Sequence, residues 1–314
     1  MRIAFFGLPV GALLLAGDGH EVAWAGICRS GALGTRRLVR LLGDKRVRVV
    51  PDASSDAILA EVRDARPDLV VSWFWTKKIP PSILRLAPSF GVHPSLLPRH
   101  RGPDPYFWAI DAGDATTGVS AHVLDDEYDT GAILGQRSLR IDPTWDAWRL
   151  ARALDRPSLE LLRDLARSFA EGRALRARAQ DERMATPAPE PADADLALQW
   201  SWPAERIERR VRAAAPWPGA WTEIGDRIVT LVRVRVTRDF PRALGPGEAS
   251  IRADGMAVVR ASDDAVELVE GRGEIEGHGE IDVPLSSRAL ARLVDAARTL
   301  SVARSLRLGF DSPK

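Results

Sequence analysis

Short apolar runs alternate with helix-like segments from the N-terminus to residue 74, and this alternation is the feature that most constrains the fold. Four of the runs have the length and composition of buried strands: residues 3–6, 21–27, 47–50 and 69–74. The segments between them have helical spacing or an amphipathic pattern: residues 10–16, 36–42 and 56–65. Strands that alternate with helices in this way predict an α/β fold with a Rossmann-like, doubly wound parallel sheet.

A change of composition divides the chain, whose 314 residues are enough for two compact domains. Residues 171–195 carry Gly172 and several prolines among Ala, Asp and Glu, with little apolar periodicity, which is typical of a linker. We therefore predict a catalytic domain at residues 1–180, a linker at residues 181–198 and a second domain at residues 199–314.

The second domain has the pattern of a small β-rich unit. A helix is predicted at residues 203–215, with proline in its first turn. Short strand-like runs broken by Gly and Asp follow at residues 228–236, 257–260 and 266–269. Runs of this kind predict a small, OB-like β-barrel. Residues 287–308 are predicted to form a terminal helix and a polar tail.

Charge and cysteine content limit the partners and the environment. Lys and Arg number 44 and Asp and Glu 43, a formal net charge of +1, so no global field draws the chain to nucleic acid or to a membrane. Cys28 is the single cysteine, so no internal disulfide can form, which fits a reducing cytoplasm. No apolar run approaches the roughly 18 residues that span a bilayer. We therefore expect a cytoplasmic protein with no membrane partner.

Two motifs carry the chemistry of the first domain. His93 opens a segment that follows the fourth predicted strand and a short helix, so it is expected at the carboxyl end of the next strand. Ligands of open α/β sheets bind at that edge. Asp129 lies in an Asp-Thr-Gly segment that follows an alternating strand pattern at residues 118–123. A carboxylate beside an imidazole can hold one tautomer and stabilise the charged ring. Alone, a histidine at a strand end is more often a structural hydrogen-bonding residue than a catalytic one, and Asp-Thr-Gly is likewise a common turn.

The order of the motifs is more specific than any one of them. His-x-Ser-Leu-Leu-Pro, Arg-Gly-x-x-Pro, Gly-Val-Ser and Asp-Thr-Gly follow one another between residues 93 and 131. This order resembles the formyltransferases that use 10-formyltetrahydrofolate, a family that includes methionyl-tRNA formyltransferases, sugar-nucleotide N-formyltransferases and glycinamide ribonucleotide formyltransferase. Residues 200–207 and the Pro-Trp-Pro-Gly at residues 216–219 look like the C-terminal domain of methionyl-tRNA formyltransferases. The resemblance therefore covers nearly the whole chain.

The resemblance implies a catalytic set of Asn, His and Asp. His93 and Asp129 match the histidine and the aspartate. His93 would polarise the formyl oxygen or move a proton, and Asp129 would orient His93. The asparagine position holds Gly91, which has no side chain to donate a hydrogen bond. Losing one preorganised oxyanion donor typically costs about 2.7–4 kcal/mol, or about 10²–10³ in rate, unless a water, a backbone N–H or another side chain replaces it.

Two functions of different classes therefore stay open. The first is transfer of a formyl group from 10-formyltetrahydrofolate to a primary amine. The second is a catalytically altered relative that binds folate or hydrolyses the formyl group, which Gly91 favours and the survival of His93 and Asp129 disfavours. A nicotinamide oxidoreductase is disfavoured, because the turn at residues 7–11 is not a complete Gly-x-Gly-x-x-Gly.

The resemblance also implies which residues bind the two substrates. The expected folate-binding residues are Phe74, Trp75, Thr76, Ser95, Leu96, Leu97, Pro98, Asp125 and Tyr128. Trp75 would stack on the pterin ring, although it equally fits as core packing. Arg101 and Gly102 are expected on the acceptor side, with a turn-stabilising salt bridge as the alternative for Arg101.

The acceptor class stays open between an aminoacyl-tRNA and a small amine such as an amino sugar. The two-domain plan favours the tRNA type. The short segment at residues 29–37 favours a small molecule, because enzymes of initiator tRNA carry a long basic loop there. Arginines of the predicted second-domain helix can contact phosphates or simply face solvent: Arg206, Arg209 and Arg210.

No metal is expected. The remaining histidines have no metal-ligand spacing with Cys28: His20, His100, His122 and His278. The only cofactor expected is 10-formyltetrahydrofolate, as a co-substrate.

Overall fold

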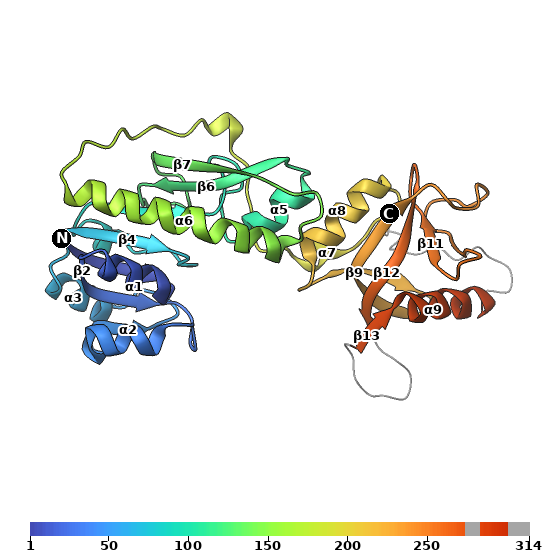
Figure 1. The fold of residues 1–314 in the computed structure, drawn as a ribbon, viewed down its shortest axis with the longest axis horizontal. Coiled ribbons are helices and arrows are strands. Elements are labelled where there is room, and N and C mark those ends of the chain that lie inside the picture. The colour runs from blue at the N-terminus through green and yellow to red at the C-terminus, as the bar shows by residue number, and fades with distance from the viewer. Residues whose placement is uncertain (274–282, 301–314) are drawn as a thin grey trace. The chain divides into compact units, whose positions relative to one another are not determined.

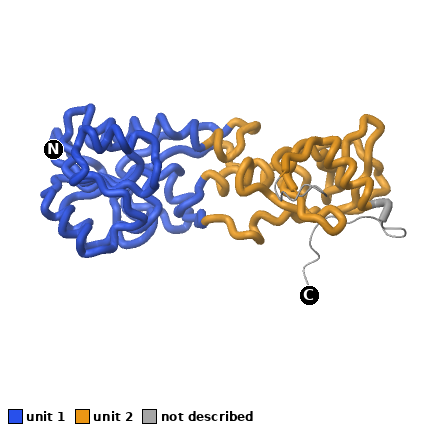
Figure 2. The backbone as a smooth tube through the Cα atoms, turned by 90° about the horizontal axis from the view of Figure 1, so that it is seen from below, with its two compact units in different colours: residues 1–105, 116–141, 151–189 blue, residues 106–115, 142–150, 190–314 orange. Residues whose placement is uncertain are grey.

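The computed structural model describes residues 1–273 and 283–300, and the chain forms two compact units (Figures 1 and 2). Unit 1 contains residues 1–105, 116–141 and 151–189, and unit 2 contains the rest. The division after Pro189 falls inside the segment predicted as a linker. Two short pieces of the predicted catalytic domain, residues 106–115 and 142–150, belong to unit 2. No change of composition marks those two pieces.

Unit 1 is built on a seven-stranded sheet with the order β3-β2-β1-β4-β5-β6-β7. Its strands are β1 (Arg2–Gly7), β2 (Glu21–Ile27), β3 (Val47–Val49), β4 (Leu69–Trp73), β5 (Ser89–His93), β6 (Thr116–His122) and β7 (Ile133–Arg140). Strands β1 to β5 pair in parallel, which confirms the Rossmann-like fold, whereas β6 and β7 run antiparallel and make the sheet mixed. The loop at residues 123–132 between β6 and β7 is shorter than the dozen or so residues that a parallel crossover needs.

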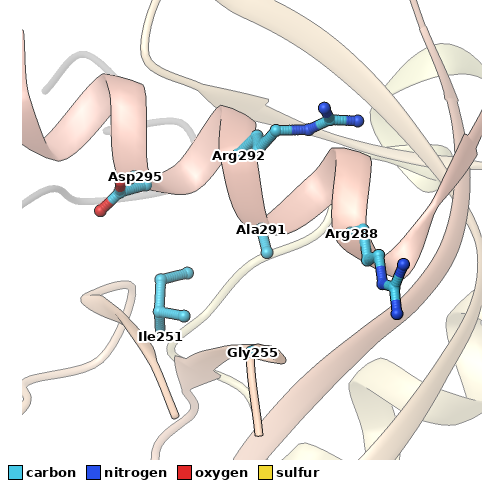
Figure 3. Close-up of a pocket in the computed structure, with 6 residues that line it drawn as sticks. All are labelled: Ile251, Gly255, Arg288, Ala291, Arg292 and Asp295. Carbon is cyan, nitrogen blue, oxygen red and sulfur yellow. The ribbon is translucent and has the colours of Figure 1, made fainter. Parts of the chain in front are cut away.

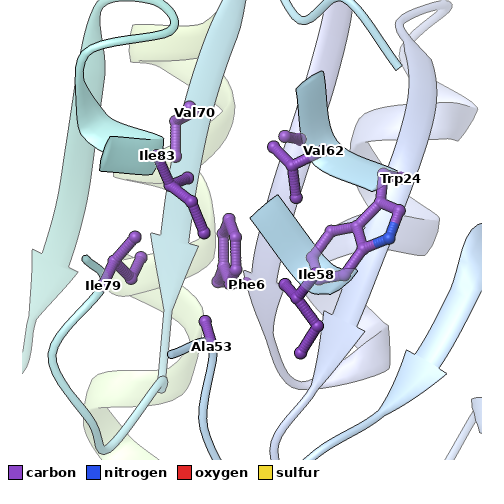
Figure 4. Close-up of a cluster of buried hydrophobic side chains, with 9 residues drawn as sticks. Phe6, Trp24, Ala53, Ile58, Val62, Val70, Ile79 and Ile83 are labelled. Atoms are coloured by element: carbon purple, nitrogen blue, oxygen red, sulfur yellow. The ribbon is translucent and has the colours of Figure 1, made fainter. Parts of the chain in front are cut away.

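Helices cover one face of this sheet through a buried cluster around Phe6 (Figure 4). Helix α3 (Asp56–Asp64) contributes Ile58 and Val62, which are four residues apart and so share a face. Its first turn is capped by Ser55, whose side chain accepts the backbone N–H of Ile58 at 3.3 Å. Helix α4 (Pro81–Leu84) adds Ile83. Each such apolar side chain contributes about 1.5–3 kcal/mol when it is fully buried.

The opposite face carries Phe5, because successive side chains of a strand alternate between faces. Helix α1 (Pro9–Gly17) packs there so closely that a Cβ on Gly11 would lie 2.7 Å from the Phe5 ring. The part of helix α6 (Ala147–Ala170) that lies in unit 1 covers the same face, since Ser158 accepts a hydrogen bond from Trp73 Nε1 at 3.1 Å. Helix α2 (Thr35–Leu42) is the remaining predicted helix of this unit.

Unit 2 holds a six-stranded antiparallel sheet, with the order β10-β11-β12-β9-β8 and β13 paired to β12. Its strands are β8 (Ala220–Ile224), β9 (Arg227–Thr237), β10 (Ala249–Ile251), β11 (Ala257–Arg260), β12 (Ala265–Gly273) and β13 (Val283–Ser286). Its helices are α5 (Pro105–Asp111, from Tyr106 on), α7 (Asp193–Leu196), α8 (Ala204–Ala214) and α9 (Ser287–Leu300). The predicted β-rich domain is therefore confirmed, and its closure into an OB-like barrel stays a prediction. The predicted tail from residue 301 to 308 lies outside the described residues.

A buried ion pair explains why residues 106–115 belong to unit 2. Arg210 of α8 donates from Nε and Nη2 to the two carboxylate oxygens of Asp111, at 2.6 and 2.9 Å. Its guanidinium also lies over the rings of Phe107 and Trp202. Both side chains of the pair are almost fully buried. Arg210 is therefore a packing residue, and of the three arginines considered for phosphate contact it is the one that the fold removes from solvent.

Candidate active site

His93 is the last residue of β5, at the edge of the sheet where ligands of this fold bind. The ring is buried, and both of its nitrogens face oxygen atoms. Nδ1 lies 3.4 Å from Oδ2 of Asp129, and Nε2 lies 2.7 Å from the backbone oxygen of His100. The structure therefore brings His93 next to the carboxylate of the Asp-Thr-Gly segment, as predicted.

Asp129 reaches the histidine from a turn in which its backbone is left-handed, with φ of 58°. A conformation of this kind costs a non-glycine residue of the order of 1–3 kcal/mol and persists where the surroundings hold it. Gln180 holds it here, since its side-chain amide donates to the backbone oxygens of Asp129 and Gly131 at 2.7 and 2.8 Å. The backbone N–H of Gly102 donates to Oδ2 of Asp129 at 3.0 Å. Gln180 therefore holds the backbone of the turn, and Gly102 holds the carboxylate.

A second buried histidine, which was considered above only as a metal ligand, completes this cluster. His122 ends β6, and its Nε2 lies 3.3 Å from Oδ1 of Asp129. Its Nδ1 lies 2.9 Å from the backbone oxygen of Val123. The alternation along β6 already placed Ser120 and His122 on one face. Which residues they would meet depended on the pairing with β5, and that pairing is not readable from β6 alone.

Burial and neighbouring groups shift the pKa values of Asp129 and His93. Burial raises the pKa of Asp129, but His93, His122 and the Gly102 N–H outweigh it and lower that pKa to about 2. Burial lowers the pKa of His93 below its ordinary value, against the opposite influence of Asp129 and of the His100 backbone oxygen. At neutral pH the cluster therefore holds an ionised Asp129 beside a neutral His93.

Gly91 lies directly across the strand pair from His122, on the floor of the same cluster. A Cβ at this position would lie 2.8 Å from Cδ2 of Leu124 and 3.4 Å from Nε2 of His122. The first distance is shorter than real Cβ contacts, so a side chain at residue 91 requires the end of Leu124 to move. Leu124 is therefore the side chain nearest to the place where a side chain at residue 91 would begin. The nearest polar atom is Nε2 of His122.

The comparisons with known proteins agree with the resemblance. Residues 39–164 match the family described as formyl transferase, and residues 192–278 match the formyl transferase C-terminal domain. A methionyl-tRNA formyltransferase of Anaeromyxobacter dehalogenans (strain 2CP-1) is 32% identical over 293 residues, which cover 88% of this chain and 93% of that protein. The chain belongs to the formyltransferase family. A second methionyl-tRNA formyltransferase, from Roseiflexus castenholzii, is 34% identical over 71% of each protein.

Solved structures show that this formyltransferase shares its fold with distant proteins. HypX from Aquifex aeolicus has a TM-score of 0.64 at 21% identity and covers 94% of this chain. The formyltransferase spans about half of that protein, since 49% of HypX is covered. The N-formyltransferase from Helicobacter canadensis, solved with folinic acid and dTDP-3-aminofucose, has a TM-score of 0.63 at 12% identity. It covers 85% of this chain and 98% of its own.

The Ser-Leu-Leu-Pro turn of the formyltransferase is clamped from the neighbouring strands. Ser120 of β6 donates from its hydroxyl to the backbone oxygen of Ser95 at 2.6 Å and accepts the N–H of Leu97 at 2.9 Å. Ser95 and Leu97 are buried, while Leu96 and Pro98 are partly exposed. Of these four predicted folate residues, the buried pair shapes the turn and the exposed pair offers surface to a ligand.

The aromatic residues after β4 divide between core and site. Trp75 packs edge-on against Phe6, with 5.4 Å between ring centroids, and Phe74 packs edge-on against Trp73. The structure thus places Trp75 against the core cluster, which was the alternative to stacking on the pterin ring. Its Nε1 atom is nevertheless buried without a hydrogen-bond partner among the described residues. Thr76, which follows, is exposed.

A pocket of about 470 Å³ adjoins the loop that carries Asp129. Its lining includes Arg101, Gly102, Tyr128, Thr130 and Thr186. Tyr128 is 44% exposed and offers its ring to this space. Asp125, the last of the predicted folate residues, accepts the Thr130 hydroxyl at 2.8 Å and so stiffens the loop.

Residues 178–189 were predicted to lie partly in the first domain and partly in a linker, and four of them line this pocket: Ala185, Thr186, Pro187 and Pro189. Arg101 donates from Nε and Nη2 to Oε1 of Gln180 at 3.1 and 2.8 Å, and from Nη1 to Glu182 at 2.8 Å. Arg101 also pairs its backbone with Pro187. Arg101 therefore forms the salt bridge that was the alternative to acceptor binding. Gly102 donates its backbone N–H to Asp129.

Other expectations concern metals and membranes. Among residues 1–273 and 283–300, no group of three or more His, Cys, Asp or Glu side chains could hold a metal ion. Cys28 donates its thiol to the backbone oxygen of Phe74 at 3.4 Å, and His278 lies outside the described residues. No helix in the described part of the chain is long and apolar enough to cross a bilayer.

Unit 2 has a pocket of its own, of about 540 Å³ (Figure 3). Ala291 of α9 points toward Ile251, so the floor is apolar. Arg288, Arg292 and Asp295 line the rim with both charge signs. Among the described residues of unit 2, no histidine or cysteine lines this pocket, so its chemistry differs from that of the site in unit 1.

Proposed function

We propose that this formyltransferase moves a formyl group from 10-formyltetrahydrofolate to a primary amine, and that His93, Asp129 and the space over Gly91 are its reaction centre. The observation that carries the proposal is the largely buried Asp129 carboxylate, 17% exposed, with a histidine on each oxygen. The family shows which group is transferred, and solved relatives were crystallised with tetrahydrofolic or folinic acid.

Formyl transfer to an amine passes through a tetrahedral intermediate. The amine nitrogen attacks the formyl carbon, the bond from that carbon to N10 of the folate breaks, and the proton lost by the amine ends on N10. The site must accept a proton from the attacking nitrogen and return it to the leaving nitrogen. Hydrogen-bond donors must face the oxygen on which negative charge develops.

His93 fits the role of the proton acceptor. A neutral imidazole carries one hydrogen, yet both nitrogens of His93 face oxygen atoms that can only accept. Uptake of a proton from the amine would satisfy both contacts at once, and the ionised Asp129 would stabilise the resulting cation. Return of that proton to N10 restores the neutral ring, so no net proton is gained or lost.

The residues that surround this centre fit a folate. The Trp75 indole N–H is a buried donor without a partner among the described residues, which an acceptor atom of a bound ring could use. The partly exposed Leu96 and Pro98 and the ring of Tyr128 are the apolar and aromatic surfaces at hand. We propose that these residues, with Phe74, Thr76, Ser95, Leu97 and Asp125 supporting them, form the folate side.

The acceptor is either an aminoacyl-tRNA or a small amine. Both domains match relatives named methionyl-tRNA formyltransferase, which supports the first class. The short segment at residues 29–37 supports the second. Arg101 is held by Gln180 and Glu182, so its part on the acceptor side would be to shape the pocket wall. A cytoplasmic location stays a prediction from the single cysteine.

One assay tests the proposal. Purified protein is incubated with 10-formyltetrahydrofolate alone, with methionyl-tRNA and with a panel of amino sugars and small amines, and release of tetrahydrofolate is followed. Release that requires an acceptor supports transfer, and the acceptor that works identifies the class. Release without any amine would show hydrolysis, and measurable folate binding without release would show an altered relative; either result overturns the proposal.

A further inference from the structure

The direct pairing of Gly91 with His122 across β5 and β6 gives the reaction centre an unusual floor. Residues that face each other across antiparallel strands have side chains on the same side of the sheet. Gly91 has none, so the space above it is bordered by the ring of His122, by the end of Leu124 and by Ser72. The polar atom of this border is Nε2 of His122, 3.4 Å from the place of the missing Cβ.

Nε2 of His122 faces the carboxylate of Asp129, and this contact favours the tautomer with its hydrogen on Nε2. Nδ1 lies 2.9 Å from the backbone oxygen of Val123. Nε2 lies 3.3 Å from Oδ1 of Asp129, and an ionised carboxylate oxygen is only an acceptor. A ring with a lone pair on Nε2 would face the carboxylate with like partial charges.

The bond from Nε2 to Asp129 is long enough to be shared. Charge-assisted N–H···O contacts are commonly 2.7–2.9 Å, and this one is 3.3 Å. The ring fixes the direction of this N–H, and at such a length its hydrogen can be shared with a second oxygen atom that enters the space over Gly91. A formyl oxygen on which negative charge develops is an acceptor of that kind.

We infer that His122 donates from Nε2 to the formyl oxygen during transfer and so does the work of the side-chain donor that is absent at residue 91. This inference rests on the proposed function. Gly91 and His122 act as a matched pair: a Cβ on residue 91 would press on Leu124 at 2.8 Å and would enter the space that the formyl oxygen needs.

A double-mutant cycle on these two positions tests the inference, with kcat and the KM for 10-formyltetrahydrofolate measured for each variant. His122→Ala is expected to lower kcat by about 10²–10³ with little change in KM, because the donor acts on the transition state. His122→Gln is expected to recover part of the rate, since an amide can also donate. Gly91→Asn is expected to lower kcat in the native background and to raise it in the His122→Ala background.

The outcomes that would overturn the inference are equally definite. An unchanged kcat in His122→Ala, or a Gly91→Asn effect of the same sign and size in both backgrounds, would show that His122 is not the donor. Thermal unfolding and folate binding are measured on every variant, and if His122→Ala does not fold, His122→Leu, which also lacks a donor, takes its place in the cycle. His20→Asn, outside the site, is the matched control and is expected to keep full activity.

The same data separate this inference from the proposed function. A native protein that releases no tetrahydrofolate with any amine defeats the proposed function itself. A native protein that transfers the formyl group while His122→Ala keeps its rate defeats only the role of His122.

Discussion

His93 and Asp129 meet with 3.4 Å between Nδ1 and Oδ2, inside a site where Asp129 is ionised and His93 is neutral. The carboxylate is the charge against which any proton taken up by His93 would be stabilised. The substitution Asp129→Asn removes that charge and keeps the shape of the side chain.

Asp129→Asn is expected to lower kcat by about 10²–10⁴, the range over which general acid–base groups act. The KM for 10-formyltetrahydrofolate should change little, because the carboxylate assists the transition state. Steady-state kinetics with a saturating acceptor measure both. Asp142→Asn is the control, since Asp142 is an exposed aspartate that caps a turn at Thr144. A kcat within twofold of the native value would contradict the role given to Asp129.

The low pKa of Asp129 predicts a contribution to stability that depends on pH. Because the folded pKa of about 2 lies below the ordinary 3.8, the folded state holds fewer protons, and this stability is lost as pH falls from about 4 to 2. The shift corresponds to about 2 kcal/mol. Urea unfolding of the native protein and of Asp129→Asn, compared at pH 6 and at the lowest pH where both fold, should show the difference shrinking. A constant difference would contradict the shift.

The lowered pKa of His93 also makes the folded protein less stable as pH falls, although His93 is a base and Asp129 is an acid. Burial lowers it in the folded state, so the unfolded chain binds the proton more readily and stability falls as pH drops below 6.5. The slope from one such group is at most about 1.4 kcal/mol per pH unit. Chemical unfolding between pH 5 and 7.5 should show a shallower slope in His93→Gln than in the native protein. Equal slopes would mean that His93 titrates normally.

The Arg210–Asp111 ion pair predicts a large stability effect inside unit 2. Arg210→Met leaves Asp111 buried without its partner, which typically costs about 3–5 kcal/mol. Arg210→Met combined with Asp111→Leu should recover most of that loss. Urea unfolding followed by tryptophan fluorescence measures both. The exposed Arg233–Glu270 pair is the matched control, and Arg233→Met should cost less than about 1 kcal/mol. Similar losses from the two arginines would refute the argument from burial.

The contacts of Gln180 predict that residues 178–189 help to hold Asp129 in place for the reaction. Its amide donates to two backbone oxygens of the Asp129 turn and accepts from Arg101, so Gln180→Ala frees a turn that is held in a left-handed conformation. A displacement of about 1 Å at a reacting group can cost about 10²-fold, and we expect kcat to fall by at least tenfold, to order of magnitude. Hydrogen exchange at residues 129–131 should become faster in parallel. A slower enzyme with unchanged exchange would place the effect elsewhere.

Much of unit 1 was predictable because its signals are local. Strand β2 has the predicted bounds, Glu21–Ile27, since a buried strand shows as a continuous apolar run. Helix α3 was predicted to within a residue from Ile58 and Val62 at helical spacing. The positions of His93 at a strand end and of Asp129 in its turn came from motifs that need no knowledge of their neighbours.

The antiparallel course of β6, the partners of Arg101 and the membership of residues 106–115 in unit 2 were not predictable in the same way. A strand's own pattern shows which side chains share a face, but its neighbour is chosen by hydrogen bonds to a distant segment. The same limit hid His122, which looked like one histidine among several until β6 paired with β5.

The amino-acid sequence by itself thus determined the family, the Rossmann-like alternation and the two side chains that we propose for the transfer, His93 and Asp129. The tertiary structure decided that Asp129 faces two histidines instead of one, and that the glycine at residue 91 lies beneath the second of them. The physical reason is distance along the chain: periodicity and motifs act over a few residues, whereas the site is assembled by strand register and by turns held from residues 178–189.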